Sequence, residues 1–154
     1  MQEWTIGEVP EATFALAGIR RIDYRSGRDG LADWALARPP ATGGIWLVCL
    51  HGHGSRGDQL YTRRDIRDRW LPEFLNRGLG VLTPNLRGNA WMGPAAVADL
   101  DDLLGLVRAE FGASAFLFAS GSMGGTGNLI YAALRPQNVA GVMARGAADR
   151  KSVA

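Results

Sequence analysis

The stretch "FASGSMGGTGN", Phe118 to Asn128, joins an apolar run to a helix-forming segment and places Ser122 at the junction. A sharp strand-to-helix turn forces its middle residue into a strained backbone conformation, so the residues two before and two after it must be small. Ser120 and Gly124 stand at these two positions and are small, and Gly121 and Gly125 add conformational freedom. The stretch therefore predicts that Ser122 is exposed at the tip of a turn, beside the first amides of a helix.

A nucleophilic role for Ser122 requires a base, because a serine hydroxyl is a weak nucleophile at neutral pH. Histidine is the base most often used for this purpose. The sequence holds two histidines, His51 and His53, and both lie upstream in "LHGHGS". The sequence thus offers a candidate nucleophile whose two candidate bases both precede it in the chain.

Composition limits the class of protein. The 154 residues predict one domain, 1–154, and a net charge of +2 with scattered arginines argues against nucleic acid as a partner. Cys49 lies in the apolar run "IWLVCL" and is expected to be a buried hydrophobe. The N-terminus lacks the basic and apolar regions of a signal peptide, and no apolar run approaches the roughly 18 residues of a membrane span. We expect a cytoplasmic protein without a membrane partner.

Apolar periodicity predicts alternating strands and helices. Strands are expected over 12–25, 32–39, 44–50, 80–86, 114–120 and 139–144, and helices over 63–78, 93–112 and 124–136. The first two strands are joined by the turn sequence "SGRDG". Pro72 inside the first helix predicts a kink or a later start. This order predicts an α/β fold with a mostly parallel sheet and helices on both faces.

Two loops are expected to meet beyond the carboxyl ends of the strands, where the working site of such sheets lies. One contains Ser122, and the other is "HGHG", His51 to Gly54, after the third strand. A helix N-terminus favours negative charge, so the amide of Met123 is expected to bind a developing oxyanion. Gly52 and Gly54 would let a second amide, that of His53, approach the same point.

These residues resemble the α/β-hydrolase fold, and the resemblance covers nearly the whole chain. It includes an early antiparallel hairpin, "HGHG" after the third strand, "TPNLRG" after the fourth and "SGSMGG" after the fifth. It is nearest to the esterase, acyl-peptidase and prolyl-oligopeptidase-like branch. Two positions depart from the family pattern: Ser120 replaces the usual first glycine of the elbow, and Asn85 stands near a position where aspartate is common before "RG".

The resemblance implies a serine hydrolase that acts on carboxylic esters or peptide-like acyl bonds through an acyl-enzyme. The family's remaining catalytic residues follow the serine, as an acid and then a histidine near the C-terminus. This sequence has no histidine after His53. The sequence is therefore expected to be an N-terminal portion of the fold, truncated after about the sixth strand.

Two alternatives stay open. The chain could be a non-catalytic hydrolase-like module that binds a small molecule or a protein. Alternatively, His51 or His53 could act as the base, although a histidine that opens an "HG" loop commonly holds the turn by hydrogen bonds. In a truncated fold the strand over 139–144 becomes an apolar sheet edge, which predicts self-association.

Other patterns in the sequence are interpreted as structural features without a binding or catalytic role. "GSMGGTG" lacks the lysine of a phosphate-binding loop, and His51, His53 and Asp58 match no recognised metal site, so neither a cofactor nor a metal is expected. The acidic run Asp99 to Asp102 is expected on a solvated helix surface. Asp149 follows the sixth strand too early to be the usual acid. Three tryptophans are expected in the core or in a pocket wall: Trp46, Trp70 and Trp91.

Overall fold

A computed structural model describes residues 3–146 of the chain. Its strands form one mixed sheet in the order β1-β2-β3-β5-β4-β6-β7. Strands β5, β4, β6 and β7 run parallel to one another, and β1, β2 and β3 join them in antiparallel fashion. The strands are β1 (Glu3–Glu8), β2 (Arg20–Arg25), β3 (Ala32–Arg38), β4 (Ile45–Val48), β5 (Gly80–Pro84), β6 (Ala115–Gly121) and β7 (Gly141–Arg145).

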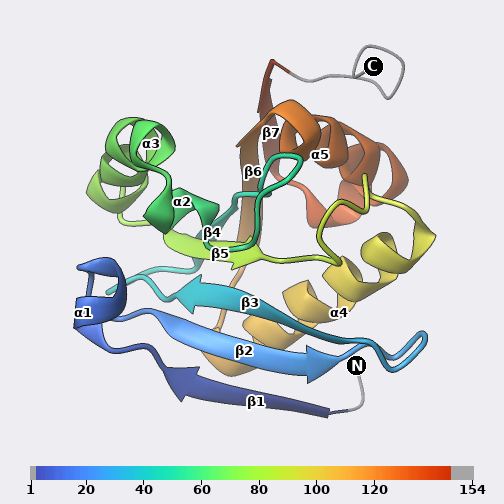
Figure 1. Cartoon of the computed structure of the whole chain (residues 1–154), viewed down its shortest axis with the longest axis horizontal. Coiled ribbons are helices and arrows are strands. Elements are labelled where there is room, and N and C mark those ends of the chain that lie inside the picture. The colour runs from blue at the N-terminus through green and yellow to red at the C-terminus, as the bar shows by residue number, and fades with distance from the viewer. Residues whose placement is uncertain (1–2, 147–154) are drawn as a thin grey trace.

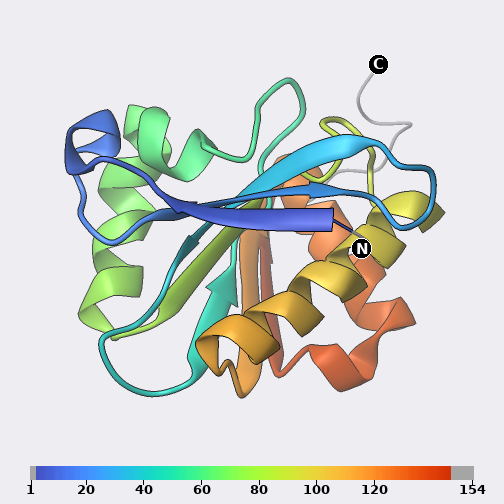
Figure 2. The same ribbon diagram turned by 90° about the horizontal axis from the view of Figure 1, so that it is seen from below.

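Helices cover both faces of the sheet (Figures 1 and 2). On one face lie α4 (Pro94–Phe111) and α5 (Ser122–Leu134), and on the other lie α1 (Glu11–Phe14), α2 (Gln59–Thr62) and α3 (Arg64–Asn76). A short 3-10 helix, η1 (Pro136–Asn138), precedes β7. Each face has its own apolar core, the first around Trp46, Leu100 and Phe118 and the second around Leu47, Leu71 and Phe74. The predicted fold class, a mostly parallel core with helices on both faces, is confirmed.

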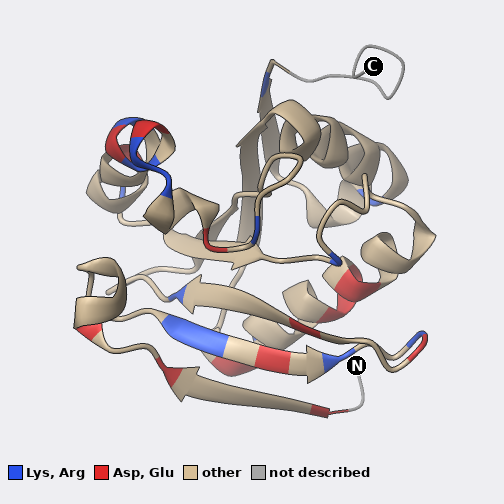
Figure 3. Ribbon diagram, viewed as in Figure 1, with Lys and Arg blue, Asp and Glu red and all other residues tan. Residues whose placement is uncertain are grey.

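The predicted helices agree closely with the structure because their apolar faces are regular. In α4, Val97, Leu100, Leu104 and Val107 are buried, and the helix ends at Gly112, which has a φ of +69°. Helix α3 runs through Pro72 without ending there, so Pro72 does not mark its start. Acidic and basic residues are interspersed along α3 and β2 (Figure 3).

The predicted first strand is wrong in its N-terminal half. Only Arg20–Arg25 is extended, whereas Glu11–Phe14 forms the short helix α1, which is followed by Ala15 and Gly18 at positive φ. The apolar alternation there reflects packing of Phe14 against the core beside α2, where its ring stacks on Tyr61. The additional strand is β1, which pairs antiparallel with β2 and was not predicted.

Strand β7 is the last strand of the sheet within the described residues. Its side chains Val142 and Met143 are exposed by 41% and 55%, so an apolar edge faces outward. Asp149 lies outside the described residues. No helix within residues 3–146 is long and apolar enough to cross a membrane.

Candidate active site

Ser122 is the first residue of α5, directly after the last residue of β6. Its φ is +54°, in the left-handed region that L residues with a side chain adopt only at an energetic cost, and the residue is exposed. Gly121 before it is still extended, with φ −122° and ψ 166°. The chain therefore reverses from strand to helix at Ser122 itself, and this turn presents the side chain at the carboxyl end of the parallel strands.

The residues around Ser122 are small because other backbone segments pass close by. A Cβ on Gly124 would lie 2.3 Å from the carbonyl oxygen of Leu50, a distance that real Cβ atoms essentially never show. A Cβ on Gly125 would lie 3.2 Å from the oxygen of Ser120, and one on Gly121 would lie 3.0 Å from the oxygen of Arg145. The start of α5 is thus packed directly on the end of β4.

Ser120 is fully buried, and its hydroxyl accepts a hydrogen bond of 2.7 Å from the backbone N–H of Leu50. Ser120 therefore connects β6 to the segment that leads from β4 into the "HGHG" loop. The neighbouring Cys49 is also buried, and burial raises the pKa of its thiol to about 12. Cys49 is consequently an uncharged side chain near neutral pH, as expected for a buried hydrophobe.

His51 is held by two backbone carbonyl groups. Its Nδ1 lies 2.8 Å from the oxygen of Gly52, and its Nε2 lies 2.8 Å from the oxygen of Asn85. Both ring nitrogens thus face backbone oxygens, and a neutral imidazole donates its one N–H to one of them. These contacts give His51 a role in connecting the loop after β4 to the turn after β5.

His53 is exposed, and its ring packs on Trp91 with 5.9 Å between centroids. The loop around it is fixed by side chains from other segments. The N–H of Gly52 donates to Gln59 Oε1 at 3.0 Å, and the N–H of Gly54 donates to Asn89 Oδ1 at 2.7 Å. The loop is therefore ordered by specific hydrogen bonds on both sides of His53.

Ser122 and His53 line the same pocket, which has a volume of about 260 Å³. Gly52 and Gly121 also line it, whereas Met123 lines a separate, smaller pocket together with His51 and Gly124. Because Met123 is the second residue of α5, its N–H belongs to the first turn, which has no acceptor within the helix. The structure thus brings the "HGHG" loop and the Ser122 turn together at one pocket.

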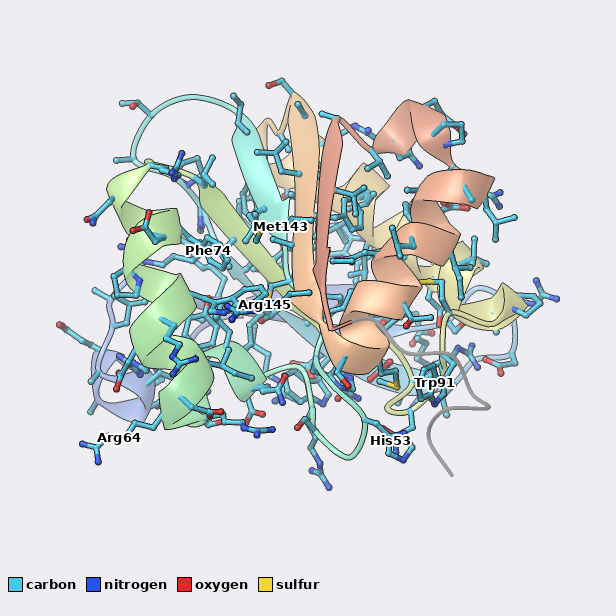
Figure 4. The ribbon with its side chains drawn as sticks, turned by 90° about the horizontal axis from the view of Figure 1, so that it is seen from above. His53, Arg64, Phe74, Trp91, Met143 and Arg145 are labelled. Atoms are coloured by element: carbon cyan, nitrogen blue, oxygen red, sulfur yellow. The ribbon has the colours of Figure 1, made fainter. Side chains whose placement is uncertain are left out.

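The walls of this pocket include Trp70, which the sequence predicted in the core or in a pocket wall, and three residues that the sequence did not single out. Helix α3 and the segment before it supply Arg63, Ile66 and Trp70, and β7 supplies Arg145. Figure 4 shows Arg145 on the side of the sheet that α3 covers, and His53 beside Trp91. Trp70 is the tryptophan that lines the pocket, whereas Trp46 is fully buried in the core.

Gln59 and Asn85 support the two loops by hydrogen bonds that the sequence did not predict. Gln59 is buried and also donates from Nε2 to Ser55 Oγ at 2.6 Å. Asn85 accepts from the N–H of Gly57 at 3.2 Å and donates to Asp33 Oδ1 at 2.8 Å. The Asn85 side chain thus supplies both a donor and an acceptor at the turn after β5.

The expectation of a solvated acidic run is wrong for two of its members. Asp99 is 2% exposed and accepts hydrogen bonds from Arg87 Nε at 2.6 Å and Ser26 Oγ at 2.5 Å. Asp101 pairs with Arg135 at 2.9 Å and accepts from Tyr131 at 2.7 Å. Arg87 has a φ of +62°, and its backbone N–H donates to Asp33, so Asp33 and Asp99 together hold the turn that also supports His51.

Within residues 3–146, no group of three or more histidine, cysteine or acidic side chains is placed to hold a metal ion.

Comparison with known proteins gives no match among protein-family models and none among curated sequences. Solved structures do match. A ferulic acid esterase from the anaerobic fungus Anaeromyces mucronatus has a TM-score of 0.66 at 16% identity, over 85% of this chain and 59% of that one. Lipase A of Candida antarctica has a TM-score of 0.65 at 14% identity, over 93% and 41%. The chain has the α/β-hydrolase fold.

A third match, described as an α/β hydrolase from Novosphingobium aromaticivorans, has a TM-score of 0.58 at 18% identity, over 84% of this chain and 44% of that one. The chain therefore spans between 41% and 59% of the length of these three structures. The fold predicted from the "HGHG" and "SGSMGG" motifs is confirmed. At identities of 14% to 18%, the likeness concerns the fold.

Proposed function

We propose that this chain carries the nucleophile of a serine hydrolase that acts on carboxylic esters or peptide-like acyl bonds. The observation that carries the proposal is Ser122, an exposed serine held at φ +54° at the strand-to-helix turn and lining a pocket. Backbone strain of this kind persists only where the surrounding structure imposes it, and it clusters at active sites. The esterase and lipase structures that share the fold support the same chemistry.

In the proposed mechanism the oxygen of Ser122 attacks the substrate carbonyl and its proton passes to a base. The carbonyl oxygen becomes an oxyanion that accepts hydrogen bonds from the backbone N–H groups of Met123 and His53. Collapse of this intermediate expels the alcohol or amine, which takes up the proton, and leaves an ester on Ser122. Water then attacks that acyl-enzyme, and the acid product leaves.

We further propose that the triad acid and histidine belong to a longer protein. Two observations support this. The chain spans about half the length of the structures that share its fold, and β7 presents the exposed apolar side chains Val142 and Met143. His51 is engaged at both ring nitrogens, so we do not assign it as the base. Because the triad acid and histidine lie outside this chain, we expect the chain by itself to hydrolyse esters slowly. We also expect its apolar β7 edge to cause self-association, which sedimentation at increasing concentration would detect.

The test is hydrolysis of p-nitrophenyl acetate by the chain with and without an added C-terminal segment that carries a triad acid and histidine. The extended chain should be faster by several orders of magnitude, and Ser122→Ala should abolish that gain. Ser114→Ala, which alters an exposed serine before β6, is the matched control and should keep it. Equal rates for the Ser122→Ala and parent chains would favour a non-catalytic binding module instead.

His53 needs its own arm of this experiment. The variant His53→Ala removes the imidazole but leaves the backbone N–H that the mechanism uses. Loss of all Ser122-dependent hydrolysis in the unextended chain carrying His53→Ala would identify His53 as the base. That result would contradict the assignment of the base to a further segment.

A further inference from the structure

The pocket beside Ser122 is lined by basic but not by acidic side chains among the described residues. Its lining includes two arginines, Arg63 and Arg145, and among its described lining residues there is no aspartate or glutamate. The other walls are largely apolar and include Ile66, Trp70 and Leu50. The pocket therefore combines an apolar wall with a local excess of positive charge.

Arg145 is fixed close to the serine by strand pairing. Arg145 pairs with Gly121 across β6 and β7. A Cβ added to Gly121 would lie only 3.0 Å from the carbonyl oxygen of Arg145. Its side chain lies on the α3 side of the sheet, which is the pocket side (Figure 4). Within residues 3–146, no carboxylate forms an ion pair with Arg145.

Arg63, which directly precedes α3, also lines the pocket. Its Nε donates to Asp65 at 3.0 Å, and both side chains of this pair are more than half exposed. The ion pair uses Nε, so the two terminal nitrogens of the Arg63 guanidinium stay available for another acceptor. Water and salt weaken an exposed pair of this kind, so Asp65 neutralises Arg63 only in part.

We propose that the pocket takes a substrate that carries a carboxylate as well as the reacting ester, with Arg145 and Arg63 binding the carboxylate. The inference deepens the proposed function and rests on it for the ester. A guanidinium presents its N–H groups in a planar fork that matches the two oxygens of a carboxylate. The walls formed by Trp70 and Ile66 fit an aromatic or aliphatic segment between the ester and the carboxylate.

The test compares two ligands of the same shape. Monomethyl terephthalate joins a methyl ester and a carboxylate through an aromatic ring, and methyl 4-carbamoylbenzoate replaces the carboxylate by a neutral amide. Calorimetric titrations use the Ser122→Ala chain, so that binding is measured without turnover. We expect the carboxylate to bind about tenfold more tightly than the amide, with a smaller ratio at high salt.

Variants of the arginines locate this preference. Arg145→Gln should remove most of it, Arg63→Gln should reduce it, and Asp65→Asn, which releases Arg63, should increase it. Arg64→Gln is the control with the same change of charge, because Arg64 is exposed next to Arg63, is not among the pocket-lining residues and points away from β7 (Figure 4). Circular dichroism establishes that each variant is folded.

Three results would overturn the inference: equal affinity for the two ligands, no binding of either at millimolar concentration, or a preference that survives Arg145→Gln and Arg63→Gln together. Failure of the proposed function looks different. In that case the Ser122→Ala and parent chains hydrolyse esters equally well in the extended protein, while the preference for the carboxylate ligand is still measured.

Discussion

The substitution Gly124→Ala tests whether the Ser122 turn packs on the backbone of Leu50 and His51, which follow β4. A Cβ at this position would meet three backbone atoms: the oxygen of Leu50 at 2.3 Å, its carbonyl carbon at 2.8 Å and the oxygen of His51 at 3.0 Å. A backbone segment cannot rotate away as a side chain can. The methyl group would therefore push the start of α5 away from the sheet.

The expected magnitude follows from two opposing effects. Overpacking a well-packed interior costs about 1–3 kcal/mol, and rigid neighbours place this site at the upper end. Alanine in a helix recovers about 1 kcal/mol relative to glycine. Gly124→Ala should therefore lower the free energy of unfolding by about 2 kcal/mol, which corresponds to a fall in Tm of about 4–8 °C for a chain of this size.

Gly105→Ala is the matched control, because Gly105 also lies in a helix, α4, but no atom lies within 4 Å of its virtual Cβ. This variant should gain up to about 1 kcal/mol from helix propensity alone. Urea unfolding followed by tryptophan fluorescence gives the free energy of unfolding of both variants, and the dependence on urea concentration, the m-value, should be the same for both. A Gly124→Ala chain as stable as the parent would refute the close packing of α5 on β4.

Three further outcomes are expected from urea unfolding. Ser122→Gly should be about 1 kcal/mol more stable than Ser122→Ala, because only glycine adopts φ +54° without strain; equal stability would argue against strain at the turn. Asp99→Ala should cost about 3 kcal/mol, because it removes the buried partner of Arg87, whereas Asp68→Ala on the exposed side of α3 should change stability by less than about 0.5 kcal/mol. Burial raises the pKa of the Cys49 thiol from 9.0 to about 12, so above pH 9 the thiol ionises in the unfolded chain but not in the native one. The free energy of unfolding should therefore be unaffected below pH 9 and fall above it by up to about 1.4 kcal/mol per pH unit. Cys49→Ala should lack this fall between pH 9 and 10.

The parts of the fold that the sequence predicted depend on local patterns. Helix α4 was located almost to the residue because Val97, Leu100, Leu104 and Val107 repeat at helical spacing and Gly112 ends it. The Ser122 turn was located because the small residues around it are adjacent in sequence. By contrast, "EWTIGE" in β1 is short and half polar, and its strand becomes visible only through its pairing with β2.

The parts that the sequence could not predict depend on partners that are distant in the chain. Asp99 lies at the border of the apolar face of α4, and its burial depends on Arg87 from the turn after β5 and on Ser26 from the β2–β3 hairpin. Arg145 reaches the pocket because the register of β7 pairs it with Gly121. A shift of one residue in that register would turn Arg145 to the other face of the sheet.

Serine at the first position of the elbow can be explained by the bond it makes. Glycine is usual there in the resembling family, but glycine at position 120 would leave the N–H of Leu50 without the hydroxyl that now accepts it at 2.7 Å. That N–H is buried where β4 gives way to the "HGHG" loop, and an unpaired buried donor costs about 1–3 kcal/mol. Because the same segment also presents the Leu50 oxygen to Gly124, Ser120 and Gly124 fix the end of β4 from two sides. Ser120 therefore replaces the freedom of a glycine with a bond that ties the end of β6, which leads into Ser122, to the segment that leads from β4 into the "HGHG" loop.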